Sequence, residues 1–271
     1  MTKKTIRSKG PFRCALVTGA SSGIGRALCE LLAKEGIHLL ITGRNKLNLY
    51  KIADELRRYV NIVVYPADLT NHEERAKIVE KIQQLAPDLV INNAGYGLYG
   101  LGTDLGSKAQ LDMIELNVSA LVEITTEAGK AMMEAHHPGV IMNISSVAAF
   151  MPFPGFAVYG ASKAFVNSYS VAMDAELSDK GIRVLASCPG QVQTNFSHRA
   201  SQGRYTSSSE NKMSSEYAAK QVWVQILKKK VLNPFDWKYK VSVFFLNYLL
   251  PTKLVAKLMM RRILKRTESN S

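Results

Sequence analysis

The sequence is poor in cysteine and contains no sign of a disulfide framework. Its three cysteines, Cys14, Cys29 and Cys188, are odd in number, far apart in the chain and without a C-x-x-C pair. This pattern argues against both a disulfide scaffold and a zinc site. It is typical of reduced, buried thiols, so we expect a cytoplasmic protein that binds no metal.

Long hydrophobic runs are also missing. The longest, residues 241–250, is interrupted by Ser242 and Asn247 and ends before Pro251, whereas a membrane-spanning helix needs about 20 apolar residues. The N-terminal residues are basic but lack the apolar segment of a signal peptide. The sequence therefore predicts neither secretion nor a membrane span.

Acidic residues are scarce at both ends of the chain, although the formal net charge is +13 overall. Residues 1–13 hold five Lys or Arg and no acid, and residues 212–271 hold thirteen against three acidic residues. The region between is close to neutral, and no nucleic-acid-binding motif accompanies the basic ends. We therefore expect no nucleic-acid partner.

Short apolar strands alternate with helical patterns along most of the chain. Strands are expected at 14–17, 37–42, 61–65, 89–93, 139–145 and 182–187, and the longer helices at 71–85, 107–135, 157–179 and 214–229. Such alternation predicts a parallel sheet with helices on both faces. We expect a single doubly wound α/β domain at 12–230, a basic arm at 1–11 and a basic amphipathic extension at 231–271, with a mobile substrate loop at about 195–215.

A glycine-rich turn joins the first strand to the first helix. Gly19, Gly23 and Gly25 occur in the pattern G-x-x-x-G-x-G, in the strand–turn–helix context of a dinucleotide fold. Glycines let the backbone approach a pyrophosphate, and the helix N-terminus favours its negative charge. A purely structural glycine turn is the alternative.

Two positions at the ends of the next strands bear on the cofactor. Arg44 follows the second strand, where NAD-binding folds usually place a carboxylate, and its guanidinium suits a 2′-phosphate. We therefore predict NADP(H) in preference to NAD(H), the alternative being a solvent-exposed arginine that opens a helix. Asp68 follows the third strand and could accept from an adenine amino group, or simply cap the helix near Asn71.

Tyr159 and Lys163 carry the chemistry that the sequence suggests. They are one helical turn apart and share a face. A tyrosine with a pKa of about 10 needs a nearby cation to act as acid or base near neutral pH. Tyr-x-x-x-Lys pairs also arise by chance, so whether this pair is catalytic depends on the other motifs. One of them is Ser146, thirteen residues before Tyr159.

Together these motifs resemble the short-chain dehydrogenase/reductase family over about residues 12–196. The matching pieces are Thr18-Gly-Ala-Ser-Ser-Gly-Ile-Gly25, Asp68, Asn92-Asn-Ala-Gly95, Asn117, Ser145-Ser146, Tyr159-x-x-x-Lys163, Pro189-Gly190 and Thr194. The resemblance implies a seven-stranded doubly wound sheet and a catalytic set of tyrosine, lysine, serine and asparagine.

The resemblance also implies a role for each member of that set. Tyr159 would be the general acid in carbonyl reduction and the base in alcohol oxidation, and Lys163 would lower its pKa and bind the nicotinamide ribose. Ser146 would hold the substrate oxygen, in preference to Ser145, because its distance to Tyr159 fits and strand alternation turns the two serines to opposite faces. Asn117 would hold a water that relays protons to Lys163.

The cofactor contacts implied by the resemblance surround the same sheet edge. They are Gly19, Ser21, Ser22, Gly23, Ile24, Gly25, Arg44, Asp68, Leu69, Asn93, Ala94, Gly95, Tyr159, Lys163, Pro189, Gly190, Val192 and Thr194. Ser22 departs from relatives that place a second basic residue in the glycine turn, so the NADP(H) prediction depends on Arg44 alone.

The C-terminal extension resembles the family least. It has an aromatic segment (Phe235, Trp237, Tyr239, Phe244, Phe245, Tyr248), then a basic row (Lys253, Lys257, Arg261, Lys265) with an apolar cluster opposite it (Val255, Ala256, Met259, Met260, Ile263). One hypothesis is peripheral binding to an anionic membrane surface that supplies a lipophilic substrate. The alternative is that the apolar side packs on its own domain or on a sister subunit.

We therefore expect an NADPH-dependent carbonyl reductase, or secondary-alcohol dehydrogenase, that acts on a lipophilic small molecule. By resemblance, a homodimer or homotetramer would form through the helices at 107–135 and 157–179. A non-catalytic NADP(H)-binding regulator or membrane-associated scaffold of the same fold is the alternative, although the intact Tyr159, Lys163, Ser146 and Asn117 argue against it.

Overall fold

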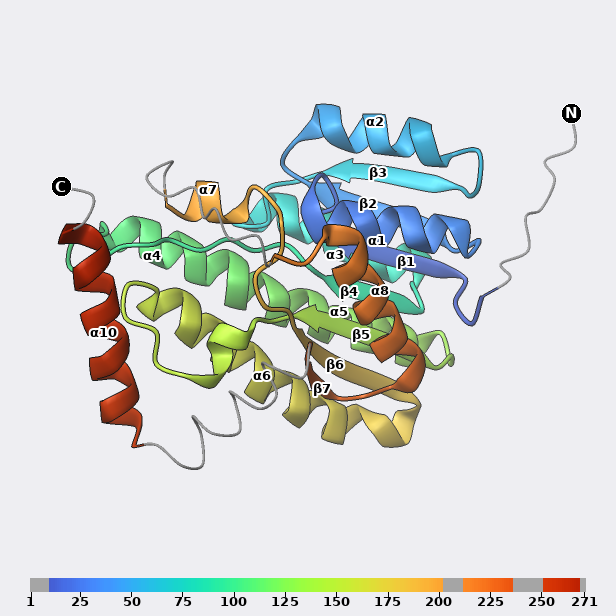
Figure 1. Cartoon of the computed structure of the whole chain (residues 1–271). Helices are drawn as coiled ribbons and strands as arrows, with labels where there is room; N and C mark the ends of the chain where they lie inside the picture. Colours follow the sequence, from blue (N-terminus) through green and yellow to red (C-terminus); the bar gives the residue numbers. More distant parts are fainter. Residues whose placement is uncertain (1–9, 202–211, 236–250, 269–271) are drawn as a thin grey trace, which may run out of the picture.

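One parallel sheet of seven strands forms the centre of the molecule (Figure 1). The computed structural model describes residues 10–201, 212–235 and 251–268, with side chains up to residue 261. The strands are β1 (Cys14–Thr18), β2 (His38–Gly43), β3 (Ile62–Pro66), β4 (Leu89–Asn92), β5 (Gly139–Ile144), β6 (Ile182–Cys188) and β7 (Leu232–Pro234). Their order is β3-β2-β1-β4-β5-β6-β7. This confirms the predicted doubly wound fold.

The strand order reverses beside β1, which pairs with both β2 and β4. Val17 is level with Ile41 on one side and with Ile91 on the other, so the three strands end together. In open parallel sheets ligands bind at the carboxyl ends of the strands, at such a reversal point. The fold therefore predicts that a ligand binds at the end of β1, in the crevice that such a reversal point offers.

Helices cover both faces of the sheet (Figure 1). They are α1 (Gly23–Lys34), α2 (Lys46–Leu56), α3 (His72–Leu85), α4 (Ser107–Ile114), α5 (Ala120–Glu134), α6 (Ala157–Leu177), α7 (Phe196–Ala200), α8 (Ser215–Lys228) and α10 (Thr252–Glu268), with shorter turns η1 (Glu115–Ser119), η2 (Val147–Phe150) and η3 (Ser178–Lys180). Strand alternation sends Val17 into an apolar cluster with α1, α2 and α8, and Leu16 into a second cluster with α3 and α5. The core is thus two layers, one on each face.

The helix expected at 107–135 is interrupted. α4 and α5 are joined by a π turn, η1, at Glu115–Ser119, which the helical pattern of the sequence does not indicate. The helix expected at 157–179 ends at Leu177 and continues as the 3-10 turn η3. Both differences concern helix geometry and leave the layer arrangement unchanged.

The domain continues past residue 230, where we expected it to end. β7 pairs with the end of β6, with Ser187 level with Asn233, and the side chain of Phe235 is only 1% exposed in the core. The expected boundary therefore comes too early, because the last strand of the sheet follows it. The rest of the aromatic segment, Trp237, Tyr239, Phe244, Phe245 and Tyr248, lies outside the described residues.

The substrate loop expected at 195–215 begins with a helix. α7 occupies Phe196–Ala200, and its first turn follows Thr194, whose hydroxyl accepts from the Phe196 backbone N–H at 3.1 Å. The middle of this segment, residues 202–211, lies outside the described residues. At least the start of the segment is therefore helical.

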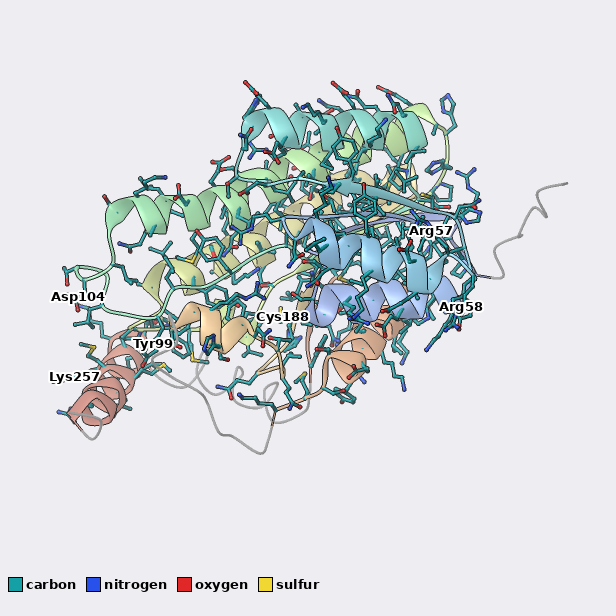
Figure 2. All side chains as sticks on the ribbon, turned by 90° about the horizontal axis from the view of Figure 1, so that it is seen from above. Arg57, Arg58, Tyr99, Asp104, Cys188 and Lys257 are labelled. Carbon is teal, nitrogen blue, oxygen red and sulfur yellow. The ribbon has the colours of Figure 1, made fainter. Side chains whose placement is uncertain are left out.

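The helix α10 lies at the carboxyl edge of the sheet, and Figure 2 shows its Lys257 at the same end of the molecule as Tyr99 and Asp104. Val255 is 4% exposed, and Met259 and Met260 are partly buried, while Lys253 and Lys257 are exposed. The apolar side of α10 thus packs on its own chain. Ile263 and Lys265 have no described side chains, and no helix among the described residues is both long and apolar enough to cross a membrane.

The cysteines are free, as expected. Cys29 and Cys188 are buried and Cys14 is partly buried. Cys188 lies in the middle of the molecule (Figure 2), where burial raises the pKa of its thiol to about 12. Such a thiol stays protonated and unreactive at neutral pH.

Candidate active site

The glycine turn packs too tightly for any side chain. Gly19 and Gly23 have φ of +64° and +56°, a region that glycine adopts without strain. A Cβ on Gly25 would lie 2.4 Å from the Gly19 carbonyl oxygen and 2.5 Å from Asn93 Nδ2. Ser22 occupies the N-cap position of α1, so the helix N-terminus faces the crevice.

The end of β4 braces this turn. Asn93 Nδ2 donates to the carbonyl oxygens of Thr18 (2.9 Å) and Gly19 (3.2 Å). The Thr18 hydroxyl accepts from the backbone N–H groups of Asn93 and Ala94. These bonds tie the predicted Asn93-Ala94 contact region to the glycine turn across the reversal point of the sheet.

Arg44 and Asp68 follow the ends of the neighbouring strands β2 and β3. The pKa of Tyr96 is raised by partial burial, with Asp112 and Asp68 adding to the rise and Arg44 opposing it. Arg44 and Asp68 are therefore both within electrostatic reach of Tyr96. Arg44 is exposed, and Asn45 rather than Arg44 caps α2 by accepting from the Asn48 N–H.

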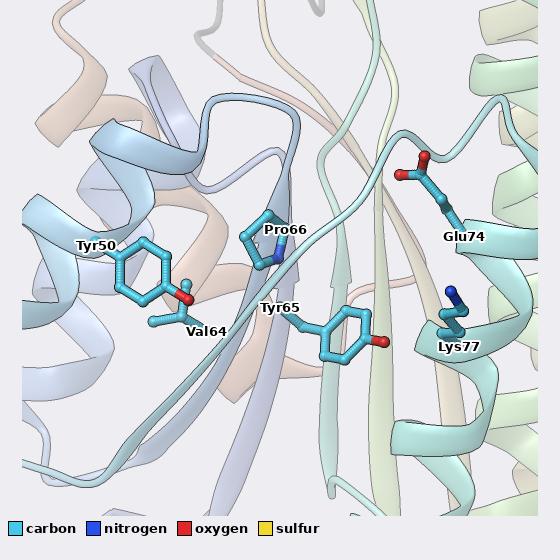
Figure 3. Close-up of a pocket in the computed structure, with 6 residues that line it drawn as sticks. All are labelled: Tyr50, Val64, Tyr65, Pro66, Glu74 and Lys77. Carbon is cyan, nitrogen blue, oxygen red and sulfur yellow. The ribbon is translucent and has the colours of Figure 1, made fainter.

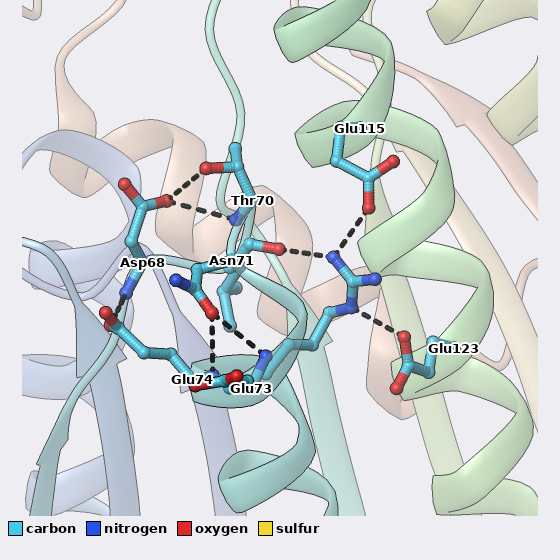
Figure 4. A network of polar contacts seen from close by, with 9 residues as sticks. Asp68, Thr70, Asn71, Glu73, Glu74, Glu115 and Glu123 are labelled. Atoms are coloured by element: carbon cyan, nitrogen blue, oxygen red, sulfur yellow. Dashed lines mark hydrogen bonds and ion pairs between the residues drawn. The ribbon is translucent and has the colours of Figure 1, made fainter.

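The alternative role of Asp68 as a helix cap is wrong. Asn71 caps α3 by accepting from the N–H groups of Glu73 (2.9 Å) and Glu74 (3.2 Å) (Figure 4). Asp68 Oδ1 instead accepts from the N–H and hydroxyl of Thr70. The side chain of Asp68 thus shapes the loop between β3 and α3.

A cavity of about 420 Å³ lies on the outer side of this loop, over the edge strand β3 (Figure 3). Its lining residues are Tyr50, Val64, Tyr65, Pro66, Glu74 and Lys77. None of them is a predicted site residue. One of the lining residues, Glu74, accepts from the Asp68 backbone N–H at 2.6 Å, so the cavity adjoins the loop after β3.

Tyr159 and Lys163 both lie on α6, facing the end of β5. Lys163 Nζ donates to the Ile144 carbonyl oxygen at 2.8 Å and lies 5.9 Å from the centroid of the Tyr159 ring. Ser146 lies close enough to Tyr159 to lower its pKa, and the Ser146 Oγ accepts from the Ala148 N–H at 3.1 Å. Ser145 Oγ, in contrast, donates to the Lys163 carbonyl oxygen. The geometry therefore brings Ser146, and not Ser145, to the phenol.

Burial shifts the two titrating groups in opposite directions. It raises the pKa of Tyr159 to about 12, against a lowering effect of Ser146. It lowers the pKa of Lys163 to about 8. The expected lowering of the Tyr159 pKa by Lys163 is thus not seen: desolvation dominates, and Lys163 is not among the groups that shift this pKa.

Asn117 lies within the π turn η1 and is 1% exposed. Its Oδ1 accepts from the Tyr96 N–H at 3.1 Å, and its Nδ2 donates to the Tyr96 carbonyl at 2.9 Å and to Ser162 Oγ at 3.2 Å. A Cβ on Gly95 would lie 3.0 Å from Asn117 Oδ1 and 3.4 Å from Lys163 Nζ. Asn117 therefore lies beside Lys163, with its side chain engaged by the protein.

The loop after β6 closes the other side of the crevice. The Pro189 carbonyl accepts from the Val147 N–H, and Val192 pairs with Met213 and packs against the core. A Cβ on Gly23 would lie 3.0 Å from Thr194 Cγ2, so Thr194 covers the glycine turn. The segment from Pro189 to Thr194, with Gly190, thus joins the other predicted residues in one site.

Four aromatic rings around Tyr159 were not predicted as site residues. Ring centroids of Phe156 and Phe196 each lie 5.4 Å from that of Tyr159, and Tyr99 and Phe153 lie 5.0 and 5.7 Å from Phe156. The spacing of Phe153, Phe156 and Tyr159 in the sequence could have suggested part of this cluster. Tyr99 and Phe196 come from other segments, so no local pattern reveals them.

Gly97 lies against these rings, with little room for a side chain. A Cβ on Gly97 would lie 3.0 Å from Phe156 Cε1, 3.0 Å from Phe196 Cζ and 3.2 Å from Tyr159 Cδ2. Three rings therefore converge on one backbone position. We call Tyr99, Phe153, Phe156 and Phe196 the ring cluster.

The family model of the short chain dehydrogenases matches residues 13–204. The chain is a short-chain dehydrogenase. An uncharacterized oxidoreductase of Staphylococcus aureus (strain USA300) is 34% identical over 184 residues, which cover 67% of this short-chain dehydrogenase and 79% of that protein.

Two solved structures extend the likeness of this short-chain dehydrogenase to its fold. A short-chain dehydrogenase from Sphingobium yanoikuyae in complex with NADPH matches with a TM-score of 0.79 and 28% identity, over 86% of this chain and 92% of that one. The bulky-bulky ketone specific alcohol dehydrogenase from Comamonas testosteroni matches with a TM-score of 0.74 and 27% identity, over 94% of each chain. The protein is therefore an oxidoreductase that uses a nicotinamide cofactor.

The residues of this short-chain dehydrogenase fit such a cofactor. The turn at Gly19, Gly23 and Gly25 leaves backbone accessible where a pyrophosphate needs close approach. Gly95, which is exposed, leaves room beside Lys163 Nζ. The end of β1 thus offers both the backbone N–H donors of the helix N-terminus and the space that the cofactor needs.

Proposed function

We propose that this short-chain dehydrogenase reduces bulky apolar ketones with NADPH and oxidises the corresponding secondary alcohols. The observation that supports the substrate class is the ring cluster: Phe156 and Phe196 contact the Tyr159 ring, and Tyr99 packs on Phe156 behind it. Aromatic walls favour apolar ligands, and a few placed polar groups orient them. The likeness to a bulky-ketone alcohol dehydrogenase supports the same class.

Three side chains would carry the chemistry. Tyr159, protonated near neutral pH, would donate its proton to the carbonyl oxygen as the bound cofactor supplies the hydride. Ser146, which lies close enough to that phenol to lower its pKa, would donate to the same oxygen as negative charge develops there. Lys163 would restore the proton to Tyr159, and its ammonium would bind ribose hydroxyls.

Asn117 would connect Tyr159, Ser146 and Lys163 to solvent. Its side-chain Oδ1 and Nδ2 are already bonded to Tyr96 and Ser162. A water held by Asn117 would therefore bind its backbone carbonyl. π turns disturb the regular helical hydrogen bonds and are frequent at functional sites, so η1 suits this role.

The preference for NADP(H) is supported by Arg44. It is exposed at the end of β2, within electrostatic reach of Tyr96 and clear of the helix cap that Asn45 provides. We expect Arg44→Ala to raise KM for NADPH about ten- to a hundredfold, as a charge-assisted bond to the 2′-phosphate contributes roughly 1.5–3 kcal/mol. KM for NADH should not change. Steady-state kinetics with both cofactors measure this, and an unchanged NADPH/NADH preference would refute the assignment.

The substrate class is tested on one residue of the ring cluster. Phe196→Ser should lower kcat/KM for a bulky aryl ketone about tenfold or more, because one apolar contact of roughly 1–3 kcal/mol is lost, and leave a small aliphatic ketone nearly unaffected. Leu227→Ser is the control, since Leu227 is 50% exposed on α8 and lies outside the ring cluster. Equal losses for both ketones would contradict the proposal.

A homodimer or homotetramer is proposed from exposed apolar side chains on the helices expected to pair. Leu111 and Ile114 on α4, and Phe165 and Val171 on α6, are 36–62% exposed. Such exposed residues on adjoining helices suit a subunit interface. Light scattering of the purified protein measures the oligomer, and a monomer at micromolar concentration would reject it.

The membrane hypothesis concerns only the outer side of α10. Leu254 and Leu258 are 44% and 45% exposed there, next to Lys253 and Lys257. Co-sedimentation with anionic vesicles at low salt tests it, and absence of binding would end it. A non-catalytic scaffold, the other alternative, would bind NADPH without reducing any ketone.

A further inference from the structure

Arg75 on α3 is a buried cation that joins three segments of the chain, and Figure 4 labels its partners Glu115 and Glu123. Its side chain is 5% exposed. One terminal nitrogen donates to the Leu69 carbonyl oxygen and to Glu115 Oε1, both at 2.7 Å, and Nε donates to Glu123 Oε2 at 2.5 Å. Leu69 lies in the loop after β3, Glu115 begins η1 and Glu123 is in the first turn of α5.

The position of the two glutamates depends on the π turn between them. They are eight residues apart, and in a regular α-helix of 3.6 residues per turn they would point about 80° apart. The π turn at Glu115–Ser119 takes up about one extra residue. The pair then resembles an i, i+7 pair, only about 20° apart, so one guanidinium can bind both carboxylates.

The ion pairs also stabilise the π turn. When Arg75 binds both carboxylates, the π turn is favoured over a regular helix, in which Glu115 and Glu123 would diverge. A buried arginine is strongly destabilising unless its donors are bonded, and charge-assisted bonds to carboxylates are among the stronger ones. Since Glu115 and Glu123 are 38% and 30% exposed, the ion pairs lie at the edge of the buried region.

The turn that Arg75 holds is the one that contains Asn117. Asn117 in turn binds both backbone groups of Tyr96 and lies beside Lys163 at Gly95. A shift of the helix by one residue would rotate Asn117 by about 100° away from these partners. The position of Asn117 therefore depends on the register that Arg75 stabilises.

We propose that Arg75 is a positioning residue for proton transfer: it keeps η1 in register so that Asn117 lies beside Lys163. The same guanidinium fixes the Leu69 carbonyl in the loop that carries Asp68. The catalytic part of this proposal, the effect on proton transfer through Asn117, rests on the proposed function. The structural part, the stabilisation of η1 by Arg75, does not. Arg75 touches neither the reacting atoms nor the predicted proton path, and acts through Asn117.

The structural part is tested by amide hydrogen exchange of the full-length protein without substrate. Arg75→Gln should speed exchange in residues 115–119 about tenfold or more, since local opening free energy falls with the lost contacts, and leave α8 unchanged. Glu123→Gln, which keeps the size of the side chain, should do the same to a smaller extent. The control is Arg183→Gln, which breaks the ion pair to Asp174 at the end of α6. Unchanged exchange in 115–119 would overturn the proposal.

The catalytic part is tested by a double-mutant cycle. Arg75→Gln should lower kcat for ketone reduction about tenfold in the wild-type background, yet by less than about twofold in the Asn117→Ala background, because coupled residues are not additive. KM for the ketone should change little in either. Equal losses in both backgrounds would mean a general structural effect and overturn this role. If Arg75→Gln does not fold, Glu123→Gln takes its place in the cycle.

The two parts separate failure of this inference from failure of the proposed function. A wild-type protein that reduces no ketone would refute the proposed function, and the exchange measurement would still decide whether Arg75 holds the turn. A wild-type protein that reduces ketones but shows additive losses would refute the positioning role alone.

Discussion

At the scale of residues, Tyr159 and Lys163 titrate in a way set by burial. The pKa of Tyr159 is raised to about 12 and that of Lys163 is lowered to about 8. Near neutral pH the phenol therefore keeps its proton, ready to donate it, while Lys163 is close to the pH at which it loses its charge. A protonated Tyr159 suits carbonyl reduction better than alcohol oxidation.

This difference predicts opposite pH profiles for the two directions. Reduction needs a protonated Tyr159 and a charged Lys163, so its kcat should be flat below about pH 8 and fall as Lys163 loses its proton above it. Oxidation needs the phenolate, whose fraction rises about tenfold per pH unit below the Tyr159 pKa, so its kcat should rise with pH. Initial rates in both directions measure this. A reduction rate that rises above about pH 8 would contradict it.

At single residues, spacing suggested only the Tyr159–Lys163 pair, whereas Ser146 and Asn117 were assigned by resemblance to the family. The structure brings the four residues together at the end of β5, and their catalytic roles stay a prediction. The raised pKa of Tyr159 was not predicted, because the spacing between Tyr159 and Lys163 says nothing about burial by rings from distant segments.

At the scale of elements, the glycine turn is held by contacts that exclude a side chain. Gly25→Ala would bring a Cβ to 2.4 Å from the Gly19 carbonyl oxygen. We expect a loss of about 1–3 kcal/mol in the free energy of unfolding, the usual cost of overpacking, and weaker NADPH binding as the turn shifts. Urea unfolding and NADPH fluorescence titration measure the two effects.

Gly102→Ala is the matched control for this turn. At Gly102 the nearest atom to an added Cβ is Gln110 Oε1, at 3.9 Å, so both stability and NADPH affinity should stay close to those of the wild type. If Gly25→Ala were as stable as Gly102→Ala and bound NADPH equally well, the tight packing of the turn would not be essential.

Elements were predicted in type and order, but not in fine geometry. The π turn at Glu115–Ser119 has no signature in a helical pattern, since it depends on Arg75, forty residues earlier than Glu115. Similarly, α7 lies in a Ser/Arg/Gln-rich segment that indicates a loop. Both departures arise from tertiary contacts that propensity does not contain.

At the scale of the whole molecule, the sheet joins the predicted residues into one site. The alternation of strands and helices predicted the doubly wound fold, and the reversal of strand order beside β1 places the glycine turn, Asn93 and Tyr159 at one edge. The boundary at residue 230 was too early because β7 is three residues long, too short for a periodic pattern. Phe235 completes the core only after that strand.

The central claim is that this molecule is an NADPH-dependent ketone reductase with Tyr159 as its acid. The most direct test is the rate of NADPH oxidation with a bulky apolar ketone, compared between the wild type and Tyr159→Phe, with NADPH affinity measured in parallel. We predict that the substitution lowers kcat about 10²–10⁴-fold, the usual contribution of a general acid, and leaves NADPH affinity nearly unchanged. Equal turnover by both proteins, or no turnover by the wild type with any ketone, would contradict the account.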